Sequence, residues 1–508
     1  MAPPFAPKCL CLDIETAAND ALALHKFGAW RPDSRQSVCI AGRQMPSALA
    51  QIDALTEGAA FVVGHNVIRH DLPALAMLFP SLKLNALPAV DTLELSPLAF
   101  PENPYHSLVK DYKLVRDSRN DPLKDAQLSF RLWSDQRDAF AALQQTSPDE
   151  LACHHYFLSR ERQRGVGSFF ATLRGAMPPK ADEVRAMLPA LVAGKTCPTQ
   201  LHSVLDEAVQ DEATGRAFSY VLAWLRVSGG NSVLPPWVRL QYPETGRLIR
   251  QLRDTPCGNP ACPYCSLYLD PLQELARYFN YAAFRPEPPN RDGGSLQEDI
   301  VRAGYAGESL LAILPTGGGK SICYQLPALS RHWRNGSLTI IVSPLQSLMK
   351  DQVDNLIKVD IYSSATLNGM LTMPERRDVL EKVRLGDIGI LLVSPEQFRN
   401  RAFIEAIRYR QIGAWVFDEA HCLSKWGNDF RPDYLYVSRF IRERYARSNE
   451  AVAPISCFTA TAKREVVEDI HAHFAESLGL DLRILDGGHE RENLNYEVIS
   501  VTRPEKNP

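Results

Sequence analysis

Residues 310–321 read LLAILPTGGGKS, an apolar run that breaks into three glycines, a lysine and a serine. A short buried strand ending in such a turn leaves successive backbone N–H groups pointing at one spot, which suits a bound phosphate chain. In this pattern Lys320 meets the β- and γ-phosphates and Ser321 meets Mg²⁺. Leu314 stands where the strict pattern has glycine, so the motif alone also fits a simple glycine turn. The residues that we expect around the phosphates are Thr316, Gly317, Gly318, Gly319, Lys320 and Ser321.

A second apolar run, residues 412–417, delivers Asp418 and Glu419 at the end of a predicted strand. A carboxylate beside the phosphate loop can hold Mg²⁺ through water, and the next carboxylate can orient the attacking water. We therefore expect Asp418, Glu419 and Lys320 to form the catalytic half of an ATPase site. SPLQSLMKDQV at 343–353 and TATA at 459–462 continue the alternation of strands and helices, which predicts an α/β fold.

These motifs, in this order over residues 275–500, resemble the RecQ family of superfamily 2 DNA helicases. The resemblance implies a RecA-like, parallel-sheet ATPase lobe over residues 276–488 that binds ATP and Mg²⁺. In the full-length protein, hydrolysis would then be coupled to DNA unwinding. The resemblance also implies that Gln297 reads adenine. FRP at 284–286 matches the family's lead-in to this glutamine, and EPPNRDGGSL between them is expected to be an inserted loop.

Residues 422–434 read CLSKWGNDFRPDY and resemble the aromatic-rich loop of the same family. Trp426 and Phe430 offer π-faces for unpaired bases and Arg431 adds charge, which is how single strands are gripped without sequence readout. The alternative is that these rings belong to the core. The resemblance implies a DNA partner, single-stranded or with a 3′ end.

The last residues of the chain, 489–508, resemble the start of a second RecA-like lobe, with NLNYEV at 493–498 as its first strand. RecQ-like enzymes resemble one another in hydrolysing ATP between two such lobes. We therefore expect a protein partner or a missing C-terminal region to supply the rest. The polypeptide alone is expected to bind ATP, to hydrolyse it feebly and not to unwind DNA.

Near the N-terminus, the run KCLCL at 8–12 leads into Asp13 and Glu15. Two carboxylates at i and i+2 on a strand project from the same face, which suits a shared pair of divalent cations. With Asp71 in FVVGHNVIRHD and Asp125 in NDPLKDA, they resemble the DEDD exonuclease superfamily and imply an RNase H-like domain over residues 1–145. The four acids would then hold two Mg²⁺ or Mn²⁺ ions for 3′–5′ cleavage. Asp91 is expected to be structural or accessory.

The position of the general base departs from this resemblance. The family places a histidine five residues before the last aspartate, or a tyrosine four before it, where this chain has Asn120 and Asp121. Asparagine does not accept a proton near neutral pH, although His70 or His106 could substitute. Three alternatives follow: an active nuclease with an altered base, a slow nuclease, or a degenerate fold that binds DNA ends. Four intact acids favour metal chemistry.

Residues 146–275 are expected to form a helical connector, with apolar spacing typical of helices at 148–165 and 206–227. The connector contains Cys257, Cys262 and Cys265, whose spacing suits a zinc knuckle or one arm of an Fe–S site. Three thiolates are one short of a closed site, and Cys197 or His202 could complete it. Zinc, an Fe–S cluster and three unligated thiols all remain open.

The composition is that of an ordinary globular protein: 508 residues, 45% hydrophobic and 23% charged, with a net charge of −3. DNA contacts must therefore come from local basic stretches. No apolar run reaches the ~18 residues of a membrane span, so we expect no membrane partner and a cytoplasmic location. Two functions compete: an ATP-dependent DNA-processing enzyme with the domain order of Werner-type proteins, and a nucleotide-gated DNA-end binding protein with a non-cleaving nuclease fold.

Overall fold

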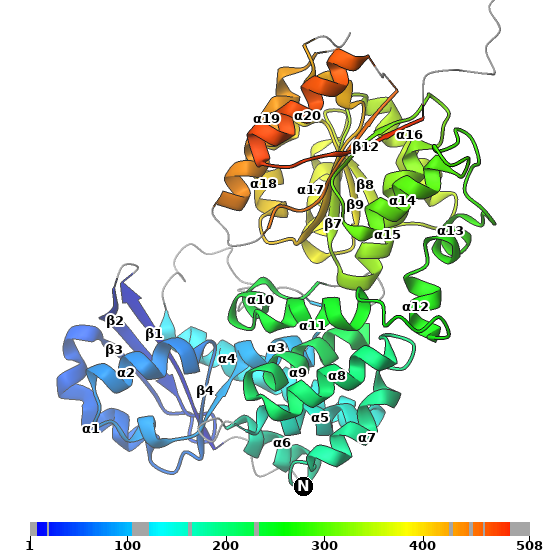
Figure 1. The fold of residues 1–508 in the computed structure, drawn as a ribbon. Coiled ribbons are helices and arrows are strands. Elements are labelled where there is room, and N and C mark those ends of the chain that lie inside the picture. Colours follow the sequence, from blue (N-terminus) through cyan, green and yellow to red (C-terminus); the bar gives the residue numbers. More distant parts are fainter. Residues whose placement is uncertain are drawn as a thin grey trace, which may run out of the picture. The chain divides into compact units, whose positions relative to one another are not determined.

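The computed structural model describes residues 8–17, 20–103, 121–160, 165–227, 233–425, 430–446, 451–460 and 463–487. The chain divides into two compact units (Figure 1). The first comprises Met1–Asp270 with the short segments Trp333–Gly336 and Arg384–Asp387, and the second comprises Pro271–His332, Ser337–Val383 and Ile388–Pro508. The finer boundaries at 145 and 275 stay predictions, and residues 489–508 lie outside the described ranges.

A mixed five-stranded sheet begins the first unit, in the order β3-β2-β1-β4-β5. β1, β2 and β3 pair antiparallel, whereas β4 and β5 run parallel to β1. β4 reads FVVG and is fully buried, while β3 alternates exposed and buried residues. The α/β expectation for this region is confirmed. The strands are β1 (Cys9–Ala17), β2 (Asp20–Trp30), β3 (Ser37–Ala41), β4 (Phe61–Gly64) and β5 (Ala89–Asp91).

The other described elements of the first unit are helices, and those from residue 148 onward agree with the helical connector that the sequence predicts. The long helix α4 lies against β1 and β2, and its buried Trp133 and Phe140 share one hydrophobic core with Phe169 and Phe218 of later helices. The helices are α1 (Met45–Thr56), α2 (Leu72–Leu78), α3 (Thr92–Ala99), α4 (Pro122–Thr146), α5 (Pro148–Leu158), α6 (Val166–Arg174), α7 (Ala181–Leu191), α8 (Pro198–Gln210), α9 (Glu212–Val227), α10 (Pro236–Gln241), α11 (Glu244–Arg253) and α12 (Pro263–Tyr268), with short turns at Gly42–Gln44, Val67–Asp71 and Lys83–Ala86.

A seven-stranded sheet forms the centre of the second unit, in the order β12-β6-β11-β10-β7-β9-β8. Every pairing within it is parallel. This confirms the parallel-sheet lobe that the sequence predicts. The strands are β6 (Leu310–Ile313), β7 (Leu338–Val342), β8 (Ser364–Leu367), β9 (Ile390–Val393), β10 (Ile412–Phe417), β11 (Ile455–Thr459) and β12 (Arg483–Asp486).

Helices cover both faces of this parallel sheet (Figure 1), which explains why its strands are continuous apolar runs. Successive residues of β10 enter different cores: Trp415 and Phe417 pack in one cluster and Val416 in the other. The helices are α13 (Pro271–Phe279), α14 (Leu296–Ala306), α15 (Lys320–Asn335), α16 (Gln346–Ile357), α17 (Met373–Leu385), α18 (Arg401–Ile407), α19 (Pro432–Ala446) and α20 (Arg464–Leu478), with turns at Pro395–Arg399 and Ala420–Leu423. Among the described helices, none is long and apolar enough to cross a membrane.

Candidate nucleotide, metal and cysteine sites

The glycine-rich loop joins the end of β6 to the first residue of α15, Lys320. Gly317 and Gly319 have φ values of +84° and +81°, in the left-handed region that glycine tolerates best. A Cβ atom on Gly319 would also lie 2.2 Å from Nε2 of Gln297. The two glycines are therefore required by the backbone path. The N-terminus of α15 begins directly behind the loop, so its unpaired N–H groups and dipole favour an anion there.

Hydrogen bonds tie this loop down on two sides. Gln297 of α14 donates from Nε2 to the Gly319 carbonyl at 3.0 Å and accepts from the Arg285 N–H at 3.0 Å. The Arg285 guanidinium donates to the Gly317 carbonyl, and the Leu314 N–H donates to the Thr459 carbonyl at 3.0 Å. Both ends of the Gln297 amide are thus already bonded, one to the phosphate loop and one to Arg285. Its role in reading adenine stays a prediction. The contact made by Arg285 was missed by the sequence reasoning, which cited this residue only as part of a lead-in.

The acidic pair lies at the end of β10, close to the same loop. Nζ of Lys320 is 3.3 Å from Oε1 of Glu419, although the two residues are far apart in the sequence. Asp418 is 5% exposed, and the Ser343 hydroxyl donates to its Oδ2 at 3.4 Å. Burial, with a further contribution from Glu419, raises the pKa of Asp418 to about 6. The structure therefore brings the predicted lysine and carboxylates together.

Glu419 is held by two basic side chains. Its Oε2 lies 3.3 Å from Nδ1 of His421, and the bond to His421, followed by Lys320, lowers the pKa of this carboxyl below its ordinary value. Hydrogen bonds to Cys422 and Glu419 raise the pKa of His421 to about 9. His421 also lies 3.4 Å from Oγ1 of Thr459 at the end of β11. Glu419 is therefore ionised near neutral pH and is linked through His421 to the neighbouring strand.

The loop predicted to grip DNA is described only in part. Phe430 is half-buried, and Arg431 donates from Nη1 to the Pro344 carbonyl at 3.2 Å. Trp426 lies outside the described residues, as do the residues of TATA at 461–462. The contacts of Phe430 and Arg431 with bases and phosphates stay predictions.

Three of the four N-terminal acids converge. Asp13 and Glu15 of β1 and Asp125 of α4 each offer an oxygen, and these oxygens lie within 4.8 Å of one another. Asp13 pairs with Gly28 on β2. A Cβ on Gly28 would lie 2.4 Å from the backbone N of Leu123, so the bare backbone at this position lets the first turn of α4 reach the sheet. That close approach carries Asp125 to the acids of β1.

Asp71, the fourth predicted acid, is not part of that three-acid group. It is 2% exposed, and its Oδ1 lies 2.7 Å from Nδ1 of His70. Burial raises the pKa of Asp71 to about 6, against the opposing effect of His70, and the charge of Glu15 adds to the rise. Asp71 therefore lies within electrostatic reach of the acids on β1 and is already paired with a histidine.

Asp91, expected to be structural or accessory, accepts three backbone N–H bonds. These come from Asn66 at 2.8 Å, Ile68 at 3.1 Å and Leu93 at 2.9 Å. Burial raises the pKa of Asp91 to about 7. Its contacts fix the turn that carries Asp71.

Of the two positions where the family has its general base, 120 and 121, the structure describes only Asp121. Asp121 is the N-cap of α4, where its Oδ1 accepts from the Lys124 N–H at 3.3 Å. Asn120 and His106 lie outside the described residues. Nε2 of His70, the other candidate base, lies 3.4 Å from Oγ1 of Thr16 on β1. The structure thus gives Asp121 a capping role.

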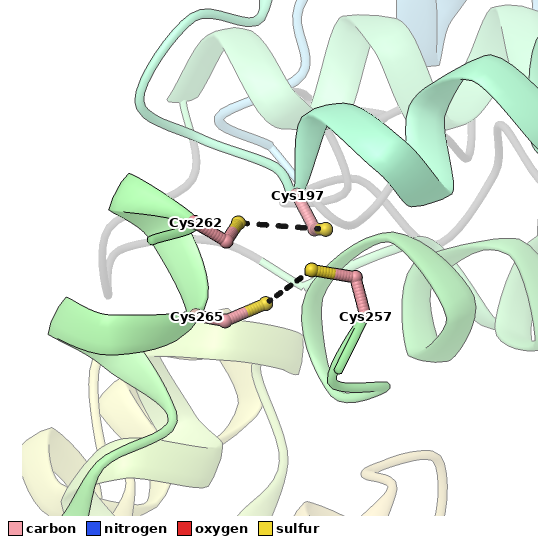
Figure 2. Close-up of side chains that lie close together, drawn as sticks. All are labelled: Cys197, Cys257, Cys262 and Cys265. Atoms are coloured by element: carbon pink, nitrogen blue, oxygen red, sulfur yellow. Dashed lines mark hydrogen bonds between the residues drawn. The ribbon is translucent and has the colours of Figure 1, made fainter. Parts of the chain in front are cut away.

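The cysteines of the connector form one group (Figure 2). Cys257, Cys262 and Cys265 are joined by Cys197, and their four Sγ atoms lie within 4.8 Å of one another. The other candidate, His202, is 83% exposed at its side chain and pairs with Asp206 at 3.6 Å. Of the two alternatives left open by the sequence, the structure selects Cys197.

Comparison with known proteins matches residues 295–470 to the family of DEAD/DEAH box helicases. A protein named ATP-dependent DNA helicase RecQ from Haemophilus influenzae is 34% identical over 46% of this chain and 34% of its own length. A probable ATP-dependent DNA helicase RecS from Bacillus subtilis is 35% identical over 46% of this chain and 40% of its own length. The RecQ protein of Bacillus subtilis is 36% identical over 44% of this chain and 34% of its own length.

The chain thus spans between 34% and 40% of the length of these relatives. The family match covers the phosphate loop, the acidic pair and β11. Residues 295–470, in the second unit, therefore match the DEAD/DEAH box helicase domain, and this part of the chain is similar in sequence to RecQ and RecS helicases.

Proposed function

We propose that this chain is the ATP-binding part of an ATP-dependent DNA helicase of the RecQ kind, joined to a metal-dependent 3′–5′ exonuclease domain. The observation that carries the helicase part is the 3.3 Å approach of Lys320 to Glu419 across the edge where β6 and β10 end. Relatives named ATP-dependent DNA helicases share this domain at 34% to 36% identity. Their names support ATP as the nucleotide and DNA as the substrate.

In this proposal the loop N–H groups surround the phosphates, and Lys320 exchanges its contact with Glu419 for the β- and γ-phosphates. Ser321 and Asp418 would hold Mg²⁺, which neutralises charge on the phosphate oxygens when bound. Glu419 keeps its bond to His421, which is the largest effect that lowers the pKa of this carboxyl. It can therefore orient the attacking water. Gln297 would have to give up its bond to the Gly319 carbonyl or to the Arg285 N–H to read adenine.

Nucleotide binding and hydrolysis test the helicase proposal. Lys320→Ala should abolish Mg²⁺-dependent binding of a fluorescent ATP analogue, because the phosphates lose their cation. Glu419→Gln should bind the analogue but, in the full-length protein, lose about 100-fold or more in DNA-stimulated hydrolysis. Lys358→Ala, at an exposed lysine bonded to Asn355, is the matched control. Wild-type binding by Lys320→Ala would disprove the site. Unwinding is to be measured on the full-length protein.

The exonuclease part rests on the convergence of Asp13, Glu15 and Asp125 within 4.8 Å. Carboxylate oxygens at this spacing suit Mg²⁺ or Mn²⁺. Asp71 lies close enough to Glu15 for the charge of Glu15 to raise the pKa of Asp71. A metal pair there would activate a water and stabilise the leaving 3′-oxygen. A DNA partner with a free 3′ end follows from that chemistry.

A second candidate function for this domain is the binding of DNA ends. It is favoured by Asp121, whose carboxylate caps α4 in the region where the family's general base is expected. In that case the domain binds DNA ends without cleaving them. We would incubate the protein with 5′-labelled single-stranded DNA and Mg²⁺ or Mn²⁺, with and without ATP. Progressive shortening that is lost in Asp13→Ala and kept in Asp138→Asn, an exposed acid of α4, supports the exonuclease. Binding without shortening supports the end-binding protein.

A further inference from the structure

Four thiols from two separated segments meet inside the first unit. Cys197 is the residue before α8, whereas Cys257, Cys262 and Cys265 lie in the loop before α12 and in α12 itself. Figure 2 shows the four side chains turned toward one point, and all four cysteines are free of disulfides. Cys197 and Cys262 are buried, while Cys257 and Cys265 are partly exposed. An ion could therefore reach the group from the side of Cys257 and Cys265.

The spacing of the sulfur atoms matches a single tetrahedral ion. Sγ of Cys197 is 3.8 Å from Sγ of Cys262, and Sγ of Cys257 is 3.8 Å from Sγ of Cys265. Zinc–sulfur bonds of ~2.3 Å in a regular tetrahedron place the sulfurs ~3.8 Å apart. A multi-iron cluster puts several iron and sulfide atoms between its thiolates, so the cysteine sulfurs around it stand farther apart. The four Sγ atoms here all lie within 4.8 Å of one another. One ion with four sulfur ligands fits the space.

The backbone is arranged to present these sulfurs. Gly258 has a φ of +74°, a left-handed turn directly after Cys257. The Cys262 N–H donates to the Asn259 carbonyl at 3.0 Å and closes the loop. The Cys197 N–H donates to the Leu252 carbonyl at 2.9 Å, which fixes Cys197 beside the end of α11. Cys197 and Cys262 are also the N-cap residues of α8 and α12, so the start of each helix fixes the backbone position of one of the four sulfurs.

We propose that Cys197, Cys257, Cys262 and Cys265 bind one structural Zn²⁺ as a closed four-thiolate site. Each cysteine binds as the thiolate and releases its proton to solvent. The ion would cross-link α8 to the last helix of the first unit, just before the second unit begins at Pro271. The site is closed because no ligand position remains for water, so its role is to hold the fold. This inference does not depend on the proposed helicase or exonuclease activity.

Metal analysis of the full chain, purified without chelator, tests the proposal. We expect about one zinc per chain and no visible colour. After dialysis against EDTA, Cys197→Ser should hold no zinc, because three sulfurs bind the ion too weakly to compete. Cys39→Ser, at an exposed cysteine of β3 outside the group, should keep the zinc of the wild type. Zinc retained equally by both variants would overturn the four-thiolate assignment.

A second measurement covers the case in which Cys197→Ser does not fold. Wild-type protein is titrated with an organomercurial thiol reagent while a zinc-sensitive dye reports released metal. We expect zinc release to track the modification of about four thiols per chain. Iron with visible absorption, two disulfides found by mass spectrometry under non-reducing conditions, or four reactive thiols without released zinc would each refute a zinc site.

Discussion

A methyl group at Gly28 is expected to push apart the three acids of the first unit. Gly28 lies on β2 opposite Asp13, and an added Cβ would sit 2.4 Å from the backbone N of Leu123 and from the carbonyl carbon of Pro122. These are backbone atoms of the first turn of α4, so no side-chain rotation can relieve the clash. The Gly28→Ala variant must therefore move the helix.

The size of the movement follows from the geometry. Ordinary contact begins at 3.4 Å, so the first turn of α4 must retreat by about 1 Å. Overpacking of this kind costs about 1–3 kcal/mol of unfolding free energy, which lowers Tm by about 2–12 °C for a unit of this size. Asp125 retreats with the turn. A displacement of ~1 Å at a catalytic centre can cost about 100-fold in rate, so metal-dependent cleavage of 3′ ends should fall by about that factor.

Thermal unfolding, Mn²⁺ titration and the 5′-labelled DNA assay measure these effects. Gly246→Ala is the matched control, because its added Cβ meets only the flexible Arg250 side chain at 3.6 Å. Replacing a helical glycine by alanine should raise stability by up to about 1 kcal/mol. If Gly28→Ala were as stable as Gly246→Ala and bound Mn²⁺ like the wild type, the packing of α4 on Gly28 would not position Asp125.

Three further predictions concern the acids and the phosphate loop. Burial raises the pKa of Asp418 from 3.8 to about 6 in the folded state. The protonated carboxyl therefore contributes its full stabilisation below pH 3.8, and this contribution is lost as the pH rises through about 6. Asp418→Asn should then match the wild type near pH ~4 and exceed it by up to about 3 kcal/mol above pH ~6, in metal-free unfolding curves. Equal differences at both pH values would contradict the burial effect. Arg285→Ala removes the contact with the Gly317 carbonyl and should weaken nucleotide binding by up to about tenfold with little change in Tm. Arg302→Ala, in an exposed pair with Glu298, is the control and should bind nucleotide like the wild type. Equal affinities of the two variants in a fluorescence titration would show that the loop does not need Arg285. Asp121→Ala removes the cap of α4 and should lower the free energy of unfolding by about 1 kcal/mol. DNA cleavage by the folded protein should stay intact. A complete loss of cleavage without a fall in Tm would instead make Asp121 the general base.

Local sequence predicted much of the nucleotide site. The apolar run before Gly317 and the run before Asp418 are strands, as expected, because continuous apolar runs suit a sheet buried on both faces. Their polar residues meet because parallel strands deliver their carboxyl ends to one edge. The loop contacts of Gln297 and Arg285 depend on how α14 lies against that edge, which no local pattern specifies.

The N-terminal site was predicted less completely. Spacing placed Asp13 and Glu15 on one face of a strand, and both join the three-acid group. The pairing of Asp71 with His70, and its position outside that group, depends on the burial of a turn and on the charges around it. The sequence offered His70 as a substitute base and could not show that its Nδ1 is already bonded to a carboxylate.

The cysteine group shows most clearly how far the sequence alone can predict a site. Sequence alone indicated that Cys257, Cys262 and Cys265, with a glycine and prolines between them, have the spacing of a zinc knuckle or of one arm of an Fe–S site. Only the tertiary structure decided between Cys197 and His202. Residues distant in the sequence meet through the packing of α8 and α11, and that packing is the sum of many apolar contacts across the first unit. Spacing encodes local geometry, whereas long-range encounters are set by the core as a whole.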